Sequence, residues 1–377
     1  MGHVRAGNAV EKAMRGKVEE VRHEDSLDFA NAPFRNIYRK AYFDLVAKAP
    51  ELLGIAYEYS DKEWKSMHYG MALERLNIQK LIGMVQDYSP DVVVSTHSLP
   101  ADMISWLLCK KKISCKHAVV ITDFDVHPVW LCHHYSRYFV PLEETKEHMV
   151  ALGFSRENVS ATGIPIDPVF AEKKDSRKMR IKHSLDPDRS TILISAGGLG
   201  MGPVEEVLCE LMKLPGKNQI VAVCGSNSEL RDSTESFASK VSRDDGNLIK
   251  VVGYTDEIDE YMSASDLILG KSGGLTSSEA LAKGLVFVIV SPVPGQEERN
   301  ADHLLEEGVA IRCNNLPVLS YKIEQLLGNA ERLQAMRQNA LMLARPNAAQ
   351  QIADEVIALV GEEGNCATFP RTHVCEN

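Results

Sequence analysis

The sequence predicts an α/β protein made of two doubly wound, Rossmann-like domains with a cleft between them. Short apolar runs typical of buried strands alternate with amphipathic helical patterns, and this series occurs twice along the 377 residues. A polar, charged segment at residues 171–190 separates the two series. We therefore expect an N-terminal domain over residues 1–170 and a C-terminal domain over residues 171–345.

The first series opens on a helical pattern, because Ala6, Val10 and Ala13 fall on one helix face. A second amphipathic helix with interleaved basic residues begins at Phe34. Proline and glycine then punctuate the chain between short β-branched runs. The expected later elements are a helix at 62–88, strands at 91–95, 117–122 and 137–141, a helix at 143–152 and a closing stretch at 159–166.

Polar side chains follow two of these strands. His97 comes just after the strand at 91–95, and Asp123, Asp125 and His127 come after the next strand along the chain. Open α/β sheets bind ligands at the carboxyl ends of their strands, so this edge is a candidate substrate site. For His97 and His127, a hydrogen-bonded loop histidine is as good an interpretation as a substrate contact.

The second series restarts with an apolar strand at 191–195, which runs into a glycine-rich turn containing Gly198 and Gly200. A single glycine cluster of this kind is weak evidence of a ligand site. A second glycine turn on a neighbouring strand strengthens it, because two amide-rich loops can hold one diphosphate. The further expected strands are 219–225, 248–253, 267–269, 286–290 and 308–312.

That second turn carries Gly273 and Gly274, leads into a helix with Glu279, and is followed after one strand by a polar loop at residues 292–300. Glycines let the backbone approach a ligand closely. The unpaired amides at a helix start attract an anion such as a phosphate, and a carboxylate one turn later can accept hydrogen bonds from a ribose. On spacing alone, an ordinary strand-to-helix turn remains an equal alternative.

Two motif halves, Gly-Gly-x-Thr-x-x-Glu at 273–279 and Pro-Gly-Gln-Glu at 294–297, resemble the nucleotide-sugar site of one glycosyltransferase family. Its members build monogalactosyl- and glucosyl-diacylglycerol, and they are related to the peptidoglycan N-acetylglucosaminyl transferase, in glycosyltransferase family 28. The resemblance implies a GT-B fold with the acceptor domain first and the UDP-sugar domain second. Ser272 and Val286 replace prolines of the family pattern, which predicts only small changes in backbone stiffness.

The family resemblance extends to the chain start, where Gly2, His3 and Ala6 match the end of a glycine-rich turn that follows a buried strand in the family. Because that strand does not precede Gly2 here, we expect the family's first strand to be missing, through a truncated record or a misplaced start codon. The alternative is that another strand closes the sheet. The architecture also implies that a final helix at 346–360 crosses back to the N-terminal domain, and the aperiodic tail at 361–377 is expected to be disordered.

The implied reaction is transfer of galactose or glucose from a UDP-sugar to the free hydroxyl of diacylglycerol, with inversion to a β-linkage. The resemblance makes His3 the candidate catalytic base, and Asp123 is a second source for a base or for its orientation. Electrostatic stabilisation by helix amides implies no divalent metal and no cofactor. The expected donor-binding residues are Gly198, Gly200, Tyr254, Gly273, Gly274, Leu275, Thr276, Glu279, Gln296, Glu297 and Asn300, and the expected acceptor-binding residues are His97, Asp125 and His127.

The composition limits which binding partners the protein can have. A net charge of −10 argues against general nucleic-acid binding, and no apolar run is long enough to span a membrane. We therefore expect a cytoplasmic protein that acts on lipid from the membrane surface. The basic, amphipathic stretch at 34–48 and the aromatic residues at 64–69 are either a solvated core helix or a contact with anionic lipid. None of the eight cysteines has CxxC spacing, so neither a zinc site nor a disulfide framework is expected.

Three alternatives stay open. The acceptor can be another lipid-linked sugar acceptor, such as a polyprenyl-linked or lipopolysaccharide-type intermediate. A UDP-sugar 2-epimerase shares the two-domain architecture and the UDP contacts but transfers no sugar. The chain can also be an inactive binding module. The choice between glucose and galactose is open as well, because the two sugars differ by the orientation of one hydroxyl.

Overall fold

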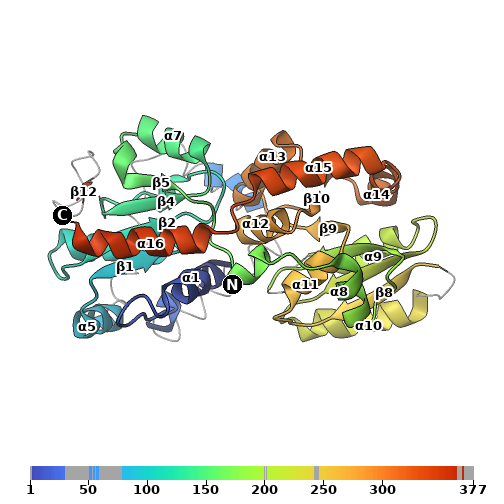
Figure 1. Ribbon diagram of the computed structural model, residues 1–377, viewed down its shortest axis with the longest axis horizontal. Coiled ribbons are helices and arrows are strands. Elements are labelled where there is room, and N and C mark those ends of the chain that lie inside the picture. The colour runs from blue at the N-terminus through green and yellow to red at the C-terminus, as the bar shows by residue number, and fades with distance from the viewer. Residues whose placement is uncertain are drawn as a thin grey trace. The chain divides into compact units, whose positions relative to one another are not determined.

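The computed structural model describes residues 2–29, 51–52, 54–55, 57–58, 79–198, 200, 202–241, 246–362 and 367–368. The chain divides into two compact units (Figure 1). The N-terminal unit comprises residues 3–167, 294–296 and 347–377, and the C-terminal unit comprises residues 1–2, 168–293 and 297–346. The division after residue 167 lies close to the predicted boundary at 170, and the return after residue 346 lies next to the predicted one.

The helices and strands follow the order that the sequence predicts, with most strands within two residues of their expected bounds. The helices are α1 (Gly2–Met14), α5 (Gln79–Tyr88), α6 (Ser98–Cys109), α7 (Glu143–Ala151), α8 (Ser176–Lys182), α9 (Val204–Leu211), α10 (Ser228–Val241), α11 (Ile258–Ala264), α12 (Gly274–Ala282), α13 (Gln296–Glu306), α14 (Leu319–Leu327), α15 (Ala330–Leu343) and α16 (Ala348–Gly361). The strands are β1 (Val92–Ser95), β2 (Lys116–Val120), β3 (His134–Tyr135), β4 (Arg137–Val140), β5 (Val159–Ala161), β6 (Ser190–Ser195), β7 (Asn218–Val223), β8 (Leu248–Val252), β9 (Leu267–Gly270), β10 (Val286–Val290), β11 (Ala310–Cys313) and β12 (Ala367–Thr368).

The N-terminal unit is built on a parallel sheet in the order β1-β2-β4-β5. Alternate residues of a strand point to opposite faces, and the core divides accordingly. Ala118 and Val120 pack with α1 and α16 on one face, whereas Val119 packs with α6 and α7 on the other. Helix α16, at the end of the chain, therefore completes this unit beside β1 and β2, as the resemblance implies (Figure 1).

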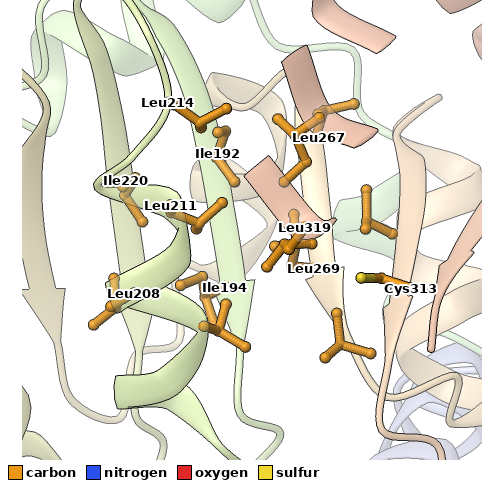
Figure 2. Packing of buried hydrophobic residues seen from close by; sticks show 14 of the residues in the cluster. Ile192, Ile194, Leu208, Leu211, Leu214, Ile220, Leu267, Leu269, Cys313 and Leu319 are labelled. Atoms are coloured by element: carbon orange, nitrogen blue, oxygen red, sulfur yellow. The ribbon is translucent and has the colours of Figure 1, made fainter. Parts of the chain in front are cut away.

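The C-terminal unit has a six-stranded parallel sheet in the order β11-β10-β9-β6-β7-β8. Counted within the unit, this is the doubly wound order 6-5-4-1-2-3 of the Rossmann fold. Apolar residues of α9 and α14 cover one sheet face, and Figure 2 shows this core with Leu211 and Leu319 directed toward Ile194 and Leu269. The winding direction reverses between β6 and β9, the point at which folds of this kind bind nucleotides.

Two expectations for the cysteines and the tail need correction. The short strand β12 (Ala367–Thr368) pairs antiparallel with β3, so backbone hydrogen bonds order this part of the tail that was expected to be disordered. Cys109 is disulfide-bonded, although the cysteine spacing predicts no such bond. Spacing signals only sequence-local pairs, whereas a fold can join distant cysteines.

Two further findings concern the membrane. Among the residues that the structure describes, no helix is both long and apolar enough to span a bilayer. The expected lipid-contacting stretches at 34–48 and 64–69 lie outside the described residues.

Candidate functional site

The two predicted glycine turns lie on adjacent strands of the C-terminal sheet. Strand β6 pairs in parallel with β9, and Ser195 at the end of β6 is in register with Gly270 at the end of β9. The strands approach closely there, since a Cβ atom at Gly270 would lie 2.7 Å from the Ser195 carbonyl oxygen. Because both strands end at the same sheet edge, the loops that follow them flank the topological switch point.

The turn after β6 is held by backbone packing against the loop after β7. Gly200 has a φ of +64°, and a Cβ there would lie 2.2 Å from the carbonyl oxygen of Cys224. The Gly198 carbonyl accepts hydrogen bonds from the backbone N and Oγ of Ser226, and the Gly200 carbonyl accepts one from Asn227 Nδ2 at 3.1 Å. Gly200 is therefore required by the fold of the turn itself, in addition to any ligand.

The turn after β9 opens directly into helix α12. Gly273 is the N-cap residue in an extended conformation, with φ −65° and ψ 137°, and it supplies no side-chain cap. Gly274 and Leu275 are buried, while Gly273 and Thr276 are partly exposed. A helix start without a side-chain cap leaves its first amides available to an anion, as the sequence predicts.

Two carboxylates and one hydroxyl surround this helix start. Glu279 lies one turn into α12 and is 1% exposed, so its carboxylate is enclosed by the fold. Glu297 Oε2 accepts a hydrogen bond from the Val293 backbone N at 2.6 Å, and a Cβ at Gly273 would lie 3.9 Å from Glu297 Oε1. The Ser272 hydroxyl donates to the Glu297 carbonyl oxygen at 2.6 Å. Glu297 of the second motif half thus meets the turn of the first motif half within the C-terminal unit.

The remaining expected donor residues are dispersed. Asn300 is 1% exposed on the buried face of α13 with Ala301 and Leu304. Tyr254 follows β8 and is 62% exposed, which leaves the neighbouring backbone open to solvent. Gln296, grouped with the N-terminal unit, donates through Nε2 to Asp123 Oδ1 at 2.6 Å. One amide N–H of Gln296 is therefore engaged by a carboxylate, and its amide oxygen takes no part in this bond.

In the N-terminal unit, helix α1 delivers His3 to the carboxyl ends of β1 and β2. His3 Nδ1 lies 3.0 Å from the Thr96 carbonyl oxygen and 2.9 Å from Thr122 Oγ1. The Thr96 hydroxyl donates in turn to the His3 carbonyl oxygen at 2.9 Å. Burial lowers the pKa of His3 from its usual 6.5 to about 4, so the ring is neutral at pH 7.

His97 and His127 both cap helices with Nδ1. His97 Nδ1 accepts a hydrogen bond from the Leu99 backbone N at 3.0 Å at the start of α6. Burial is the largest cause that lowers the pKa of His97, to about 3. His127 Nδ1 accepts from the Val129 backbone N, and its Nε2 lies 3.1 Å from the Tyr57 carbonyl oxygen. Both nitrogens of His127 are thus engaged, whereas His97 uses one, which favours His97 over His127 as an acceptor contact.

The two expected aspartates differ in burial. Asp123 is 6% exposed, and its second oxygen, Oδ2, accepts a hydrogen bond from Trp130 Nε1 at 3.3 Å. Asp125 Oδ1 accepts from the Val126 backbone N at 2.8 Å and lies 3.6 Å from His148 Nδ1. The Asp123 carboxylate is therefore held in place as a hydrogen-bond acceptor for Trp130, which lies near His3. Asp125 instead bonds to the backbone of the residue that follows it.

One group of potential metal ligands occurs among the described residues. Side-chain atoms of His183, Glu257 and Glu260 all lie within 4.8 Å of one another. The Lys182 ammonium contacts both glutamates, at 2.9 and 2.5 Å, and so supplies the positive charge that a metal ion would bring. This arrangement is that of a salt-bridge cluster.

The sequence did not predict the contacts that three residues make in the site. Ser272 was expected only to alter backbone stiffness, yet it is fully buried and hydrogen bonds to Glu297. Thr96 resembles part of the family's acceptor-side loops and Thr122 was expected only as the end of a strand, and neither was expected to hold His3.

Comparison with known proteins identifies relatives of both units. Residues 3–166 match the family model for monogalactosyldiacylglycerol (MGDG) synthase, and residues 191–355 match the glycosyltransferase family 28 C-terminal domain. A processive diacylglycerol beta-glucosyltransferase of Bacillus cereus is 30% identical over 363 residues, which cover 95% of this chain and 90% of that protein.

Solved structures share the fold at low sequence identity. MurG of Acinetobacter baumannii has a TM-score of 0.53 at 18% identity and covers 75% of this chain and 78% of that one. The UDP complex of S. aureus MnaA has a TM-score of 0.53 at 19% identity and covers 78% of this chain and 80% of that one. These likenesses establish the GT-B type of architecture, two Rossmann-like units in one chain.

Proposed function

Because the chain belongs to the diacylglycerol glycosyltransferase group of glycosyltransferase family 28, which includes the processive diacylglycerol beta-glucosyltransferases, we propose that it transfers a hexose from a UDP-sugar to diacylglycerol. The donor is UDP-glucose or UDP-galactose, and the product is a β-glycosyldiacylglycerol formed with inversion. The uncapped start of α12 beside the β6 turn, at the switch point of the C-terminal sheet, is the observation that carries this proposal.

In this proposal the C-terminal unit binds the donor. The amides of Gly273 to Thr276 bind the diphosphate, whose charge grows as the sugar leaves, and preorganised amides stabilise that charge. Glu279, one helical turn further, accepts hydrogen bonds from the ribose, and Glu297 binds sugar hydroxyls. Lys271, between the two turns, adds a positive charge near the same loops, since a Cβ at Gly202 would lie 3.9 Å from its Cε.

The N-terminal unit supplies the groups that act on the acceptor. His3 is neutral at pH 7 and can accept the proton of the attacking hydroxyl, as a general base must. Asp123 is held by Trp130 and Gln296, which suits a role in orienting neighbouring groups more than one as the mobile base. The amide contacts to the diphosphate would make a divalent metal unnecessary.

The proposed acceptor, diacylglycerol, also determines where in the cell we propose that the protein acts. Diacylglycerol resides in a bilayer, so the enzyme must reach it from the membrane surface, on the cytoplasmic side where UDP-sugars are made. Flotation with liposomes of phosphatidylcholine alone, or with phosphatidylglycerol added, measures this association. Stronger recovery with the anionic vesicles supports a charged lipid contact, and equal recovery argues against one.

The decisive experiment incubates the chain with UDP-glucose or UDP-galactose and diacylglycerol-containing liposomes, with and without EDTA, and analyses the lipid by mass spectrometry. A mass gain of one hexose in the lipid fraction confirms the proposal, and the preferred donor identifies the sugar. Activity that persists in EDTA supports the metal-free mechanism.

The same reaction set tests a second function. An epimerase would convert UDP-N-acetylglucosamine without any lipid, which nucleotide-sugar chromatography detects. UDP binding by calorimetry without turnover of any donor would instead identify an inactive binding module.

A further inference from the structure

The hydrogen bonds of His3 assign its two ring nitrogens. Nδ1 lies 3.0 Å from the Thr96 carbonyl oxygen, and a carbonyl oxygen can only accept. Nδ1 must therefore carry the hydrogen, and a neutral imidazole has only one, so Nε2 keeps its lone pair. Within the described part of the chain, no group hydrogen bonds to Nε2, and His3 as a residue is half-buried.

His97 has the opposite arrangement. Its Nδ1 accepts the backbone N–H of Leu99 at the start of α6, so this nitrogen bears the lone pair. The single hydrogen of the neutral ring must then be on Nε2. His97 therefore presents a hydrogen-bond donor where His3 presents an acceptor.

The two rings are neighbours. Their centroids lie 4.4 Å apart with an angle of 77° between the ring planes. Burial lowers the pKa of both histidines, and the charge of a protonated His3 would lower the pKa of His97 further. Both rings are thus neutral near pH 7, the state for which the nitrogen assignments hold.

We propose that His3 and His97 act as a complementary pair on one acceptor hydroxyl, which donates its hydrogen to His3 Nε2 and accepts a hydrogen bond from His97 Nε2. This inference rests on the proposed function. A hydroxyl offers one donor and two acceptor sites, so this pair matches it and fixes the oxygen's orientation. His97 then stabilises the negative charge that grows on the oxygen as its proton leaves.

The proton and electron balance is complete. The hydroxyl oxygen forms the bond to the anomeric carbon, the bond from that carbon to the diphosphate oxygen breaks, and UDP leaves with the electron pair. The hydroxyl proton moves to His3 Nε2 and gives an imidazolium, which later releases a proton to solvent. Its Nδ1–H faces two acceptors, the Thr96 carbonyl and Thr122 Oγ1, and both stabilise the positive charge.

Thr96 and Thr122 are positioning residues in this arrangement. They follow the neighbouring parallel strands β1 and β2, whose register pairs Ser95 with Val119. Thr96 holds His3 twice, by its carbonyl to the ring and by its hydroxyl to the His3 backbone. The sheet edge thereby fixes the ring without using Nε2.

The nitrogen assignments are measured without any substrate. In the full chain labelled with ¹⁵N-histidine, long-range ¹H–¹⁵N correlation spectra at pH 7.5 distinguish the two tautomers, and the His3→Gln and His97→Asn variants identify the signals by their loss. We expect the hydrogen of His3 on Nδ1 and that of His97 on Nε2. Finding both rings in the same tautomer overturns the pair.

Matched variants test its role in turnover. His97→Asn keeps a good N-cap for α6 but removes the Nε2 donor. We expect kcat to fall by about 100- to 1000-fold, as for loss of one donor to a developing oxyanion, with the Kd for UDP unchanged. An unchanged kcat refutes the role of His97.

Thr122→Val removes the acceptor that stabilises the imidazolium, and Thr122→Ser restores it. We expect the acid limb of the kcat/KM profile to move to lower pH in Thr122→Val, with kcat reduced by about tenfold, and both to recover in Thr122→Ser. Identical profiles in all three proteins refute the positioning role. If the wild-type chain transfers no hexose, the proposed function fails, whereas the tautomer measurement still decides the assignment of the pair.

Discussion

The Ser272 hydroxyl donates a 2.6 Å hydrogen bond to the Glu297 carbonyl oxygen and so joins the turn before α12 to the first turn of α13. Glu297 belongs to the second motif half, and Ser272 immediately precedes the first. This hydrogen bond couples the two segments, because the loop that presents the α12 amides also holds the Glu297 backbone in place.

Ser272→Ala should loosen this connection. Ser272 is fully buried, so the change removes the hydrogen bond of a buried hydroxyl, and we expect the free energy of unfolding to fall by about 1 kcal/mol. UDP affinity should fall several-fold as the Glu297 loop relaxes. Urea denaturation and calorimetry measure the two effects. Ser278→Ala is the matched control, since its hydroxyl donates to the Gly274 carbonyl within the same helix, α12. Equal losses in both variants would contradict a specific role for Ser272.

Glu279→Gln should weaken UDP binding by about tenfold or more while the fold is kept. The amide is nearly isosteric with the buried carboxylate, but it replaces a charged acceptor, whose hydrogen bonds contribute about 1.5–3 kcal/mol. Calorimetry with UDP measures the change, and circular dichroism monitors the fold. Glu206→Gln, on the exposed face of α9, serves as the control. Undiminished UDP affinity in Glu279→Gln would remove this residue from the donor site.

Gly200→Ala and Gly197→Ala form a pair that separates crowding from backbone strain. Both glycines have positive φ, +64° and +72°, so each alanine costs about 1–2 kcal/mol. At Gly200 the new Cβ also meets the Cys224 carbonyl at 2.2 Å, whereas at Gly197 nothing lies within 4 Å. We expect Gly200→Ala to be clearly less stable in thermal denaturation and to lose more UDP affinity. Indistinguishable variants would show that the turn can move away from the β7 loop.

Stability should fall in mild acid because of His117. This ring is fully buried between Ser95 Oγ and the His134 carbonyl, and burial lowers the pKa of His117 from 6.5 to about 4. A depressed folded-state pKa gives stability that is complete above 6.5 and is lost as the pH falls toward 4. One such group corresponds to about 2 kcal/mol between pH 7.5 and 5.

Urea denaturation at both pH values tests this expectation in the wild type and in His117→Gln. The variant should show a smaller loss on acidification, and His148→Gln, at an exposed histidine, should behave like the wild type. Titration of Glu260 does not contribute to the loss of stability between pH 7.5 and 5. Burial alone would raise the pKa of Glu260, but bonds from Lys182, His183 and Lys174 outweigh it and hold it at about 2, so its stabilisation is lost only below pH 4.5. An unaltered pH dependence in His117→Gln would rule out this histidine as the cause.

The sequence by itself determined the two α/β series, the glycine turns and the family, because hydrophobic periodicity and turn chemistry are properties of residues close together in the chain. The strands from β6 to β11 and the carboxylate of Glu279 on α12 follow from such patterns. The small tail strand β12 was missed because its two residues gain order only by pairing with β3.

Only the tertiary structure decided which atoms can act. The ring nitrogens of His3 are assigned by Thr96 and Thr122, which lie 93 and 119 residues away along the chain. The Ser272 hydroxyl finds its acceptor 25 residues later, across a helix and a strand. Hydrogen-bond direction depends on which groups the folded sheet edges bring within about 3 Å, and no local pattern encodes that proximity.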